Sequence, residues 1–321
     1  MQDKNSLIGM LLIFVLLFTF MQLNKPSEVE LQHQKHIQDS IALAKQRIET
    51  GTTETTTTPT LAPTYTGNVK ADSLLKTQLG GKFGAFAASA IGTEQTQTIE
   101  NEVFKITFTN KGGRIKDVLL KNYLKVVKDA DGKESKVPLS LLEDVKNKFE
   151  YHLPVQGVGT VSTADLLFAP TIAGNTITFR ADAGEGKFME QSYSIKPNAY
   201  DIDYSVRFEG LANTISAESN QIKLFWENYL DQLELGVDYE RTMATLAFKK
   251  AEESPNECSC TKSDMQQLGA PVKWVSATNQ FFNTSLVAGQ SFSSATLHTD
   301  VPSEKTAEDL KKLSAELYVP F

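Results

Sequence analysis

An uninterrupted apolar run near the N-terminus constrains this chain more than any other feature of its sequence. Residues 7–23 read LIGMLLIFVLLFTFMQL and contain no charged side chain. At about 1.5 Å per residue, a helix of this length spans roughly 26 Å, a little less than the hydrocarbon core of a bilayer. Because lipid offers no partners to backbone amides, such a run is stable in a membrane only as a helix. The sequence therefore predicts a transmembrane anchor within residues 1–25.

The anchor is expected to be retained rather than cleaved. A signal peptide would have a positive N-terminal region and a small-x-small cleavage site. Here Asp3 and Lys4 cancel, and the exit segment at residues 22–26 contains no Ala-x-Ala pattern. A lipoprotein anchor would need a cysteine just after the apolar run, whereas the first cysteine is Cys258. The residues predicted to form the membrane anchor are Leu7, Ile8, Leu11, Leu12, Ile13, Phe14, Val15, Leu16, Leu17, Phe18 and Phe20.

The overall composition excludes several classes of function. The formal net charge is −7 and the isoelectric point is about 5.3, which argues against a nucleic-acid partner, because such partners require a basic face. Two cysteines in 321 residues exclude a disulfide scaffold and a four-thiolate zinc site. Because few residues are of the kinds that carry chemistry, we also expect no cofactor, no metal and no small-molecule substrate.

Residues 26–98 are predicted to connect the anchor to a folded domain. Residues 28–49 are polar and helix-prone with a narrow apolar stripe, which is typical of a juxtamembrane helix or a weak coiled coil rather than of a core helix. Residues 51–68 form a Thr/Pro-rich spacer that cannot bury enough surface to fold. A further helix over residues 69–90 is expected to break near Gly80, Gly81 and Gly84.

From about residue 99, where the predicted β-domain of residues 99–321 begins, the apolar residues recur with the period of a β-strand. Phe104, Ile106 and Phe108 alternate with polar residues, and residues 200–208 place Tyr200, Ile202, Tyr204, Val206 and Phe208 on one face, which is expected to be core. Turn signals separate these runs, among them Gly112-Gly113, residues 184–186 and Pro197-Asn198. Many short strands at this spacing predict an antiparallel sandwich or barrel.

The last segment is predicted to be helical. Ser303 is a suitable N-cap, acidic residues follow it, and Lys311 and Lys312 stand in the last turn. Leu310 and Leu313 would form the buried edge of this C-terminal helix.

Four segments, in this order, resemble a known family. They are residues 5–14 (NSLIGMLLIF), residues 100–123 with the run ENEVFKITFTNKGGRI and then VLLKNY, residues 192–195 (SYSI) with the strand after them, and residues 273–283 (KWVSATNQFFN). Together they resemble the first part of a YidC-type membrane protein insertase of Gram-negative bacteria. The resemblance implies a mainly β fold: an N-terminal transmembrane helix followed by a large antiparallel β-super-sandwich similar to galactose mutarotases.

The resemblance also implies a location and partners. The chain would sit in the bacterial inner membrane, with its β-domain in the periplasm, and would contact inner-membrane lipid, nascent membrane proteins and translocon subunits. It would assist the insertion and folding of membrane proteins rather than act as an enzyme, and we expect no catalytic residues. In the family, the insertase core lies in five further transmembrane helices, which we expect this chain not to contain.

Two alternatives remain open from the residues alone. A mutarotase-like enzyme would need a general acid and a general base on opposite sides of a hemiacetal, usually a glutamate with histidine partners. The histidines available to the β-domain are His152 and His298, and they would have to converge with a carboxylate within about 5 Å. The other alternative is a membrane-tethered structural or adhesion protein.

Few side chains are candidates for a binding site. Trp274, Phe281 and Phe282 form the densest aromatic cluster, and they would either line a peptide-holding cleft or pack in the core. Cys258 and Cys260 would either hold a metal, form a strained disulfide, or remain two spare thiols in a polar loop.

Overall fold

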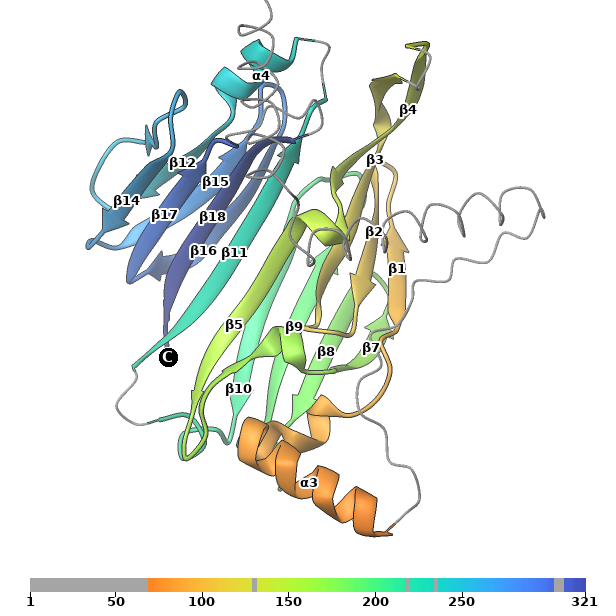
Figure 1. The fold of residues 1–321 in the computed structure, drawn as a ribbon, viewed down its shortest axis with the longest axis vertical. Coiled ribbons are helices and arrows are strands. Elements are labelled where there is room, and N and C mark those ends of the chain that lie inside the picture. Colours follow the sequence, from red (N-terminus) through yellow and green to blue (C-terminus); the bar gives the residue numbers. More distant parts are fainter. Residues whose placement is uncertain (1–68, 129–131, 217–219, 234–235, 303–308) are drawn as a thin grey trace, which may run out of the picture. The chain divides into compact units, whose positions relative to one another are not determined.

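The strand period that begins near residue 99 corresponds to antiparallel strands along most of the chain (Figure 1). The computed structural model describes residues 69–128, 132–216, 220–233, 236–302 and 309–321, all of which belong to one compact unit, Pro59–Phe321. The predicted anchor at residues 1–25 and the connecting residues 26–68 lie outside the described residues. Within the described ranges, no helix is both long and apolar enough to cross a membrane.

Two four-stranded sheets form the N-terminal half of the β-domain. The first has the order β1-β2-β3-β4, built from β1 (Thr96–Glu100), β2 (Phe104–Thr109), β3 (Arg114–Lys128) and β4 (Glu134–Leu142). The second has the order β10-β9-β8-β7, built from β7 (Ala169–Ala173), β8 (Thr176–Asp182), β9 (Phe188–Ile195) and β10 (Ile202–Glu209). The predicted turns at Gly112-Gly113, residues 184–186 and Pro197-Asn198 connect consecutive strands of these sheets.

A six-stranded sheet and a further four-stranded sheet complete the fold. The six-stranded sheet has the order β14-β17-β18-β11-β5-β6, built from β5 (Asn147–Val155), β6 (Gly159–Ser162), β11 (Gln221–Asp231), β14 (Asp264–Leu268), β17 (Ser294–Asp300) and β18 (Asp309–Pro320). The last sheet has the order β13-β12-β15-β16, built from β12 (Thr245–Lys250), β13 (Asn256–Glu257), β15 (Val272–Thr278) and β16 (Asn283–Phe292).

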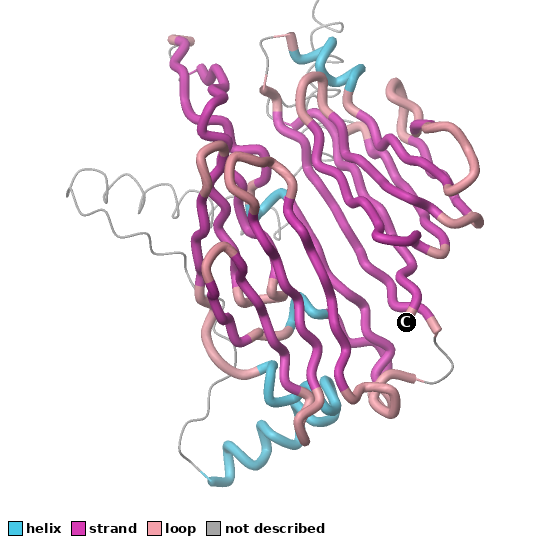
Figure 2. The backbone as a smooth tube through the Cα atoms, turned by 180° about the vertical axis from the view of Figure 1, so that it is seen from behind, coloured by secondary structure: helices cyan, strands magenta, loops and turns pink. Residues whose placement is uncertain are grey.

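The six-stranded sheet is the layer that the other three sheets share. Its strand β5 contacts β3, its strands β17 and β18 contact β12 and β16, and the hydroxyl of Tyr151 on β5 bonds that of Tyr204 on β10. Figure 2 shows the strands of all four sheets running in broadly similar directions. Their inward side chains form one hydrophobic core, to which the four sheets contribute, for example, Ile106, Phe179, Leu224 and Val275. The predicted antiparallel sandwich is therefore present.

The outward face of the six-stranded sheet is polar, as expected for strands with one buried face. Cross-strand ion pairs cover it, including Lys223–Glu316 at 3.0 Å and Lys148–Glu227 at 2.8 Å. On the same strands, Leu224 and Trp226 point inward and are buried. This alternation fixes the register, because a one-residue slip would exchange the two faces.

Helical elements precede the first sheet and add to its core. The α-helix α3 (Val69–Phe83) is followed by the 3-10 helix η1 (Gly84–Ala90), and Phe83 and Phe86 are buried in the main core. The break predicted near three glycines falls at Gly84, whose φ is +56°, and α3 runs through the other two. The core thus includes residues N-terminal to residue 99. The remaining helices of the described residues are short: η2 (Asp144–Lys146), η3 (Thr163–Asp165) and α4 (Val237–Met243).

The predicted C-terminal helix is wrong. Residues from Asp309 to Pro320 form β18, which lies between β17 and β11 and pairs with both. Leu313, Ala315 and Leu317 alternate into the core, and this period-two burial outweighs the local helix signals. Leu310 and Leu313 are buried as expected, but as strand residues. Residues 303–308 lie outside the described part of the chain.

Candidate functional site

A cleft of about 1150 Å³ is bounded by strands from all four sheets. Its floor is the inner face of β5 and β11, with Phe149, Tyr151, Leu224, Trp226 and Asn228. Strands β2 and β3 form one part of the wall, β10 a second part, and β16 a third. The cleft therefore lies where the other three sheets meet over the shared layer.

The face of β10 that the sequence assigns to the core is a wall of this cleft. Ile202, Tyr204 and Val206 alternate with exposed residues as predicted, but they are half-buried and line the cleft. Tyr200 precedes the strand and is 50% exposed. The alternation was predicted correctly. The prediction that this face is fully buried was wrong, because no described sheet covers it completely.

The lining is almost free of charge. Among the described residues that line the cleft, Asp201 and Asp203 alone are charged. Lys196 pairs with them at 2.7 Å and 3.2 Å, and its hydrogen bond to Asp201 holds the pKa of that carboxyl below its usual range. No lysine or arginine lines the cleft in the described part of the chain. Its chemistry suits an apolar guest without an anionic group.

The hydroxyls of Tyr151, Tyr193 and Tyr204 form a buried cluster where the floor of the cleft meets its wall. The hydroxyl of Tyr204 is 2.9 Å from that of Tyr151 and 2.8 Å from Oε1 of Gln191. Burial raises the pKa of the Tyr151, Tyr193 and Tyr204 hydroxyls above the ordinary value of 10.0. These hydroxyls therefore stay neutral and act as hydrogen-bonding groups within the packed wall.

The same cluster fixes the Gly112-Gly113 turn between β2 and β3. Nε2 of Gln191 donates to the carbonyl of Gly112 at 2.8 Å, and the hydroxyl of Tyr193 donates to that of Gly113 at 2.9 Å. Gly113 has a φ of +62°, and a Cβ there would lie 2.8 Å from Nε2 of Gln191. The turn therefore requires glycine for both its conformation and its space.

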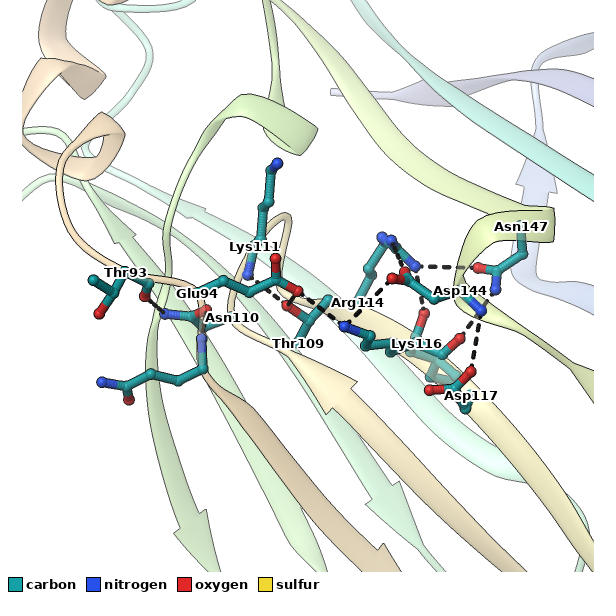
Figure 3. A network of polar contacts seen from close by, with 12 residues as sticks. Thr93, Glu94, Thr109, Asn110, Lys111, Arg114, Lys116, Asp117, Asp144 and Asn147 are labelled. Carbon is teal, nitrogen blue, oxygen red and sulfur yellow. Dashed lines mark hydrogen bonds and ion pairs between the residues drawn. The ribbon is translucent and has the colours of Figure 1, made fainter. Parts of the chain in front are cut away.

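A polar network links β3 to η2 and to the start of β5 (Figure 3), and one of its members, Asn147, also lines the cleft. Arg114 donates to Asp144 at 2.5 Å and to Oδ1 of Asn147 at 3.2 Å. Lys116 lies 3.3 Å from both Glu94 and Asp144; burial alone would lower its pKa, but these two carboxylates outweigh it and raise it. The network is internally paired, so we interpret it as a support for β3 and β5 rather than as a reactive centre.

Asn228 differs from its neighbour in the sheet in having no partner. Asn228 stands directly opposite Asn147 in the β11–β5 ladder. The side chain of Asn147 donates to the carbonyls of Lys116 and Glu143 and accepts from Arg114. Asn228 is only 2% exposed, and among the described residues neither its amide nitrogen nor its amide oxygen has a hydrogen-bond partner. It lines both the cleft and an adjoining cavity of about 20 Å³.

The aromatic residues singled out in the sequence occupy different positions. Phe281 and Phe282 line the cleft, and the ring of Phe282 packs edge-on against that of Tyr123 on β3, with centroids 5.1 Å apart. This contact joins the β1–β4 sheet to the turn before β16. Phe281 is 65% exposed. Trp274 is half-buried on β15 and is not among the residues that line the cleft.

The two histidines of the mutarotase hypothesis do not converge. His152 on β5 is bonded to Glu150 at 3.3 Å, whereas His298 lies on β17 opposite Ser314. According to the strand registers, β5 and β17 are three strand spacings apart in the sheet, and the two histidines are offset by four residues along the strand direction. Together these offsets correspond to roughly 20 Å. A shared acid–base site built on these two imidazoles is therefore excluded by the sheet geometry.

The two cysteines are both free thiols. Burial raises the pKa of Cys258 to about 12, so its thiol is unreactive at neutral pH. Within the described ranges, no three His, Cys, Asp or Glu side chains are grouped in a way that could hold a metal ion.

Two features of the cleft were missed by sequence reasoning. The amide of Asn228, which has no partner among the described residues, has no sequence signal, because the residues that line the cavity beside it come from β4, β11, β15 and β16. The other feature is the strand β16 itself, whose ten residues NTSLVAGQSF carry no charge. That run was visible in the sequence and could have been recognised as an unprotected strand.

Comparison with known proteins places this architecture in a family. Residues 96–317 match the YidC periplasmic domain. The chain is 32% identical over 321 residues to a protein of Parabacteroides distasonis named "Membrane protein insertase YidC", covering 99% of this chain and 49% of that protein. A protein of the same name from Phocaeicola vulgatus is 30% identical over 99% of this chain and 48% of its own length. The chain thus spans about half the length of the curated relatives it matches.

Among solved structures, a galactose mutarotase-like protein from Lactobacillus casei aligns with 70% of this chain and 89% of its own, at a TM-score of 0.38 and 10% identity. A likeness at this level decides neither the fold nor the function. The match to the family covers all four described sheets and all three parts of the cleft wall, and on that basis the chain belongs to the YidC periplasmic domain family.

Proposed function

We propose that this chain supplies the membrane anchor and the periplasmic domain of a membrane protein insertase. In this role it assists the insertion and folding of inner-membrane proteins by contacting the inserting polypeptide or subunits of the translocon. The observation that carries the proposal is the family match over the whole β-domain, which contains a large apolar cleft. The names of the relatives support the same role.

The domain organisation follows from the same proposal. Residues 1–25 hold the chain in the inner membrane, residues 26–98 connect the anchor to the β-domain, and residues 99–321 form the bulk of the periplasmic part. The Thr/Pro-rich residues 51–68 would give the domain a reach of roughly 20–25 Å from its tether. Such a reach allows the domain to meet a segment that has just emerged from the bilayer.

The cleft is suited to this role by its chemistry. Segments of membrane proteins are rich in apolar residues, and their exposure to water is unfavourable in proportion to their apolar area. A cleft with apolar walls, lined by no cation among the described residues, can cover part of such a segment without requiring a charged group on it.

Site-specific photo-cross-linking in growing cells tests this function. A photoreactive amino acid is placed in turn at Phe281 beside the cleft and at three outward positions of the six-stranded sheet, Lys148, Lys223 and Thr296. The expected result is cross-links between newly made inner-membrane proteins and the β-domain, strongest during their synthesis. Cross-links to soluble periplasmic proteins alone, from every position, would contradict the proposal.

Membrane topology is tested separately. A periplasmic reporter fused after residue 70 should be active, and the mass of the mature chain should include residues 1–24. A mature N-terminus between residues 20 and 50 would remove the anchor from the proposal, while leaving the role of the β-domain to the cross-linking result.

A further inference from the structure

Strand β16 has a free edge along the cleft. It is the last strand of its sheet and pairs with β15 on one side, and no described strand pairs with its other side. The register shifts between Val272 and Trp274, so the regular part of the edge comprises residues 283–287. Every residue from 283 to 292 lines the cleft. A row of unpaired backbone amides and carbonyls therefore borders an apolar space.

This edge lacks the protection that other sheet edges have. In natural proteins, charged side chains, a proline or a short strand length prevent an edge strand from pairing with another chain. Among the edge strands of the described residues, β1, β4, β10, β13 and β14 carry charges, β7 contains Pro170, and β6 has four residues. β16 has ten residues with no charge and no proline. Its bulge at residues 288–291 shortens the regular edge but leaves about 17 Å of it available.

The side chains of β16 favour an added strand. Leu286 points inward and packs against the core, whereas Val287 points outward and is 73% exposed, more than any other exposed large hydrophobic residue in the described part of the chain. A strand added beside β16 would cover Val287 on one face. Its other face would lie over the apolar floor at Leu224 and Trp226.

The floor also offers a polar group that a peptide can use. The amide of Asn228 presents a donor and an acceptor without partners, at the boundary between the cleft and the smaller cavity. A peptide group offers the complementary acceptor and donor, whereas a hydrocarbon chain offers neither. In the described part of the chain, the lining also offers no cation for the phosphate of a lipid headgroup.

We propose that the cleft binds an extended, uncharged segment of a partner polypeptide, which adds to the free edge of β16 as a further strand. The inference rests on the proposed function, since it specifies how the β-domain would hold an inserting protein. Backbone hydrogen bonds to residues 283–287 give the affinity, alternate side chains enter the apolar cleft, and the amide of Asn228 bonds the peptide backbone. Recognition of this kind depends on an extended, apolar segment rather than on one sequence.

The test uses the 321-residue chain in lipid nanodiscs and a fluorescent eight-residue peptide of alternating valine and threonine with two C-terminal lysines. Fluorescence anisotropy should report saturable binding, and hydrogen exchange should show protection of residues 283–287 in the complex. A control peptide with N-methyl groups on all central amides keeps the side chains but cannot form the strand. Its affinity should be at least about tenfold lower, the equivalent of one good hydrogen bond.

Three variants locate the site. Val287→Lys places a charge on the exposed face of the edge and should weaken binding about tenfold. Ile172→Lys is the matched control: it places a charge on a different edge strand, β7, where Ile172 is 48% exposed. It should leave binding unchanged. Asn228→Leu should weaken binding without loss of folding, which a thermal melt on the same sample verifies.

Several outcomes would overturn strand addition. Equal binding of the N-methylated peptide, or equally tight binding of a decanoyl probe, would identify the cleft as an acyl-chain site. A dimer in sedimentation equilibrium that Val287→Lys abolishes, without peptide binding, would identify a second copy of this chain as the occupant. Absence of peptide binding together with cellular cross-links from Phe281 would reject strand addition while the proposed function stands. Peptide binding without any membrane-protein cross-link would reject the proposed function instead.

Discussion

Two asparagines that face each other across β11 and β5 differ in how their side-chain amides are satisfied. Asn147 makes three hydrogen bonds, to Arg114 and to the carbonyls of Lys116 and Glu143. Asn228 is buried as well, yet among the described residues its amide has no partner. A buried amide without hydrogen bonds destabilises a fold, and the guest proposed above would relieve that cost by bonding the amide of Asn228.

We expect opposite effects on stability from the same substitution at these two positions. Asn228→Leu removes an unsatisfied amide and should raise the free energy of unfolding by about 1–2 kcal/mol. Asn147→Leu breaks a satisfied network, leaves Arg114 without one acceptor, and should lower the free energy of unfolding by about 1–3 kcal/mol. Urea denaturation of both variants measures the difference. A loss of stability in Asn228→Leu would show that its amide has a partner in solution.

Three buried tyrosine hydroxyls and one buried cysteine thiol make the free energy of unfolding of the domain depend on pH in the alkaline range. Burial raises the pKa of Tyr151, Tyr193 and Tyr204 above 10.0, and that of Cys258 from 9.0 to about 12. Above about pH 9 the unfolded chain therefore binds fewer protons than the folded chain, and the free energy of unfolding falls as the pH rises. Below pH 9 the contribution of these groups is fully present.

These groups should not change the melting temperature between pH 7 and pH 8.5. From pH 9 upward they should lower it progressively. Each group contributes at most about 1.4 kcal/mol per pH unit between its unfolded and folded pKa. Cys258→Ala should reduce the fall that begins near pH 9 and leave the tyrosine-dependent fall above pH 10. Calorimetry between pH 7 and pH 11 checks both. An unchanged onset in Cys258→Ala would contradict the assignment of the thiol.

At the scale of elements, β18 shows how a sheet overrides local helix signals. As a helix, this segment would place Leu310, Leu313 and Leu317 on one face and Ala315 on the opposite one. As the strand observed, it buries Leu313, Ala315 and Leu317 together. Because β18 pairs with β17 and β11 along most of its length, it contributes backbone hydrogen bonds on both sides.

Substitution of Ala315 distinguishes the strand from the helix. Ala315→Asp places a charge in the core beneath β18 and should lower the free energy of unfolding by more than about 3 kcal/mol, which is enough to prevent cooperative folding. Glu316→Gln removes a charge from the polar outer face and should cost less than about 1 kcal/mol. Thermal melts followed by circular dichroism compare the two. A well-folded Ala315→Asp variant would favour the helix.

At the scale of the whole molecule, the shared six-stranded sheet determines which side chains meet. It brings β3, β10 and β16 to one cleft although they are far apart in the sequence. The same geometry keeps His152 and His298 on strands that are not neighbours. The arrangement of the sheets thus forms the cleft and keeps apart the two histidines that the mutarotase hypothesis would bring together.

We accordingly expect the chain not to accelerate the mutarotation of α-galactose above the rate in buffer. Polarimetry with the wild-type chain, and with His152→Ala and His298→Ala as controls, measures this. The physical reason is that general acid–base catalysis requires both groups within hydrogen-bonding reach of the same sugar. A rate above background that either histidine variant abolishes would restore the enzyme hypothesis.

Much of the strand structure was predictable from the sequence. The alternation of Phe104, Ile106 and Phe108 predicted β2, and the glycines at 112 and 113 predicted the turn that follows it. These predictions succeed because the period of burial and the conformational freedom of glycine are local properties. The family resemblance was also carried by short segments, and the match over residues 96–317 confirms it. The anchor at residues 1–25 remains a prediction.

The C-terminal strand, the cleft and the partnerless Asn228 were decided only by the tertiary structure. Capping and charge signals at a helix end contribute about 1 kcal/mol or less each, whereas a central strand buries several side chains and pairs on both sides. The half-burial of Tyr204 depends on which sheets meet above β5 and β11, and that is set by pairings in the six-stranded sheet between residues 71 to 99 positions apart. A chain's local pattern determines which residues form strands, but the edges left free between sheets arise only when all of the sheets are assembled.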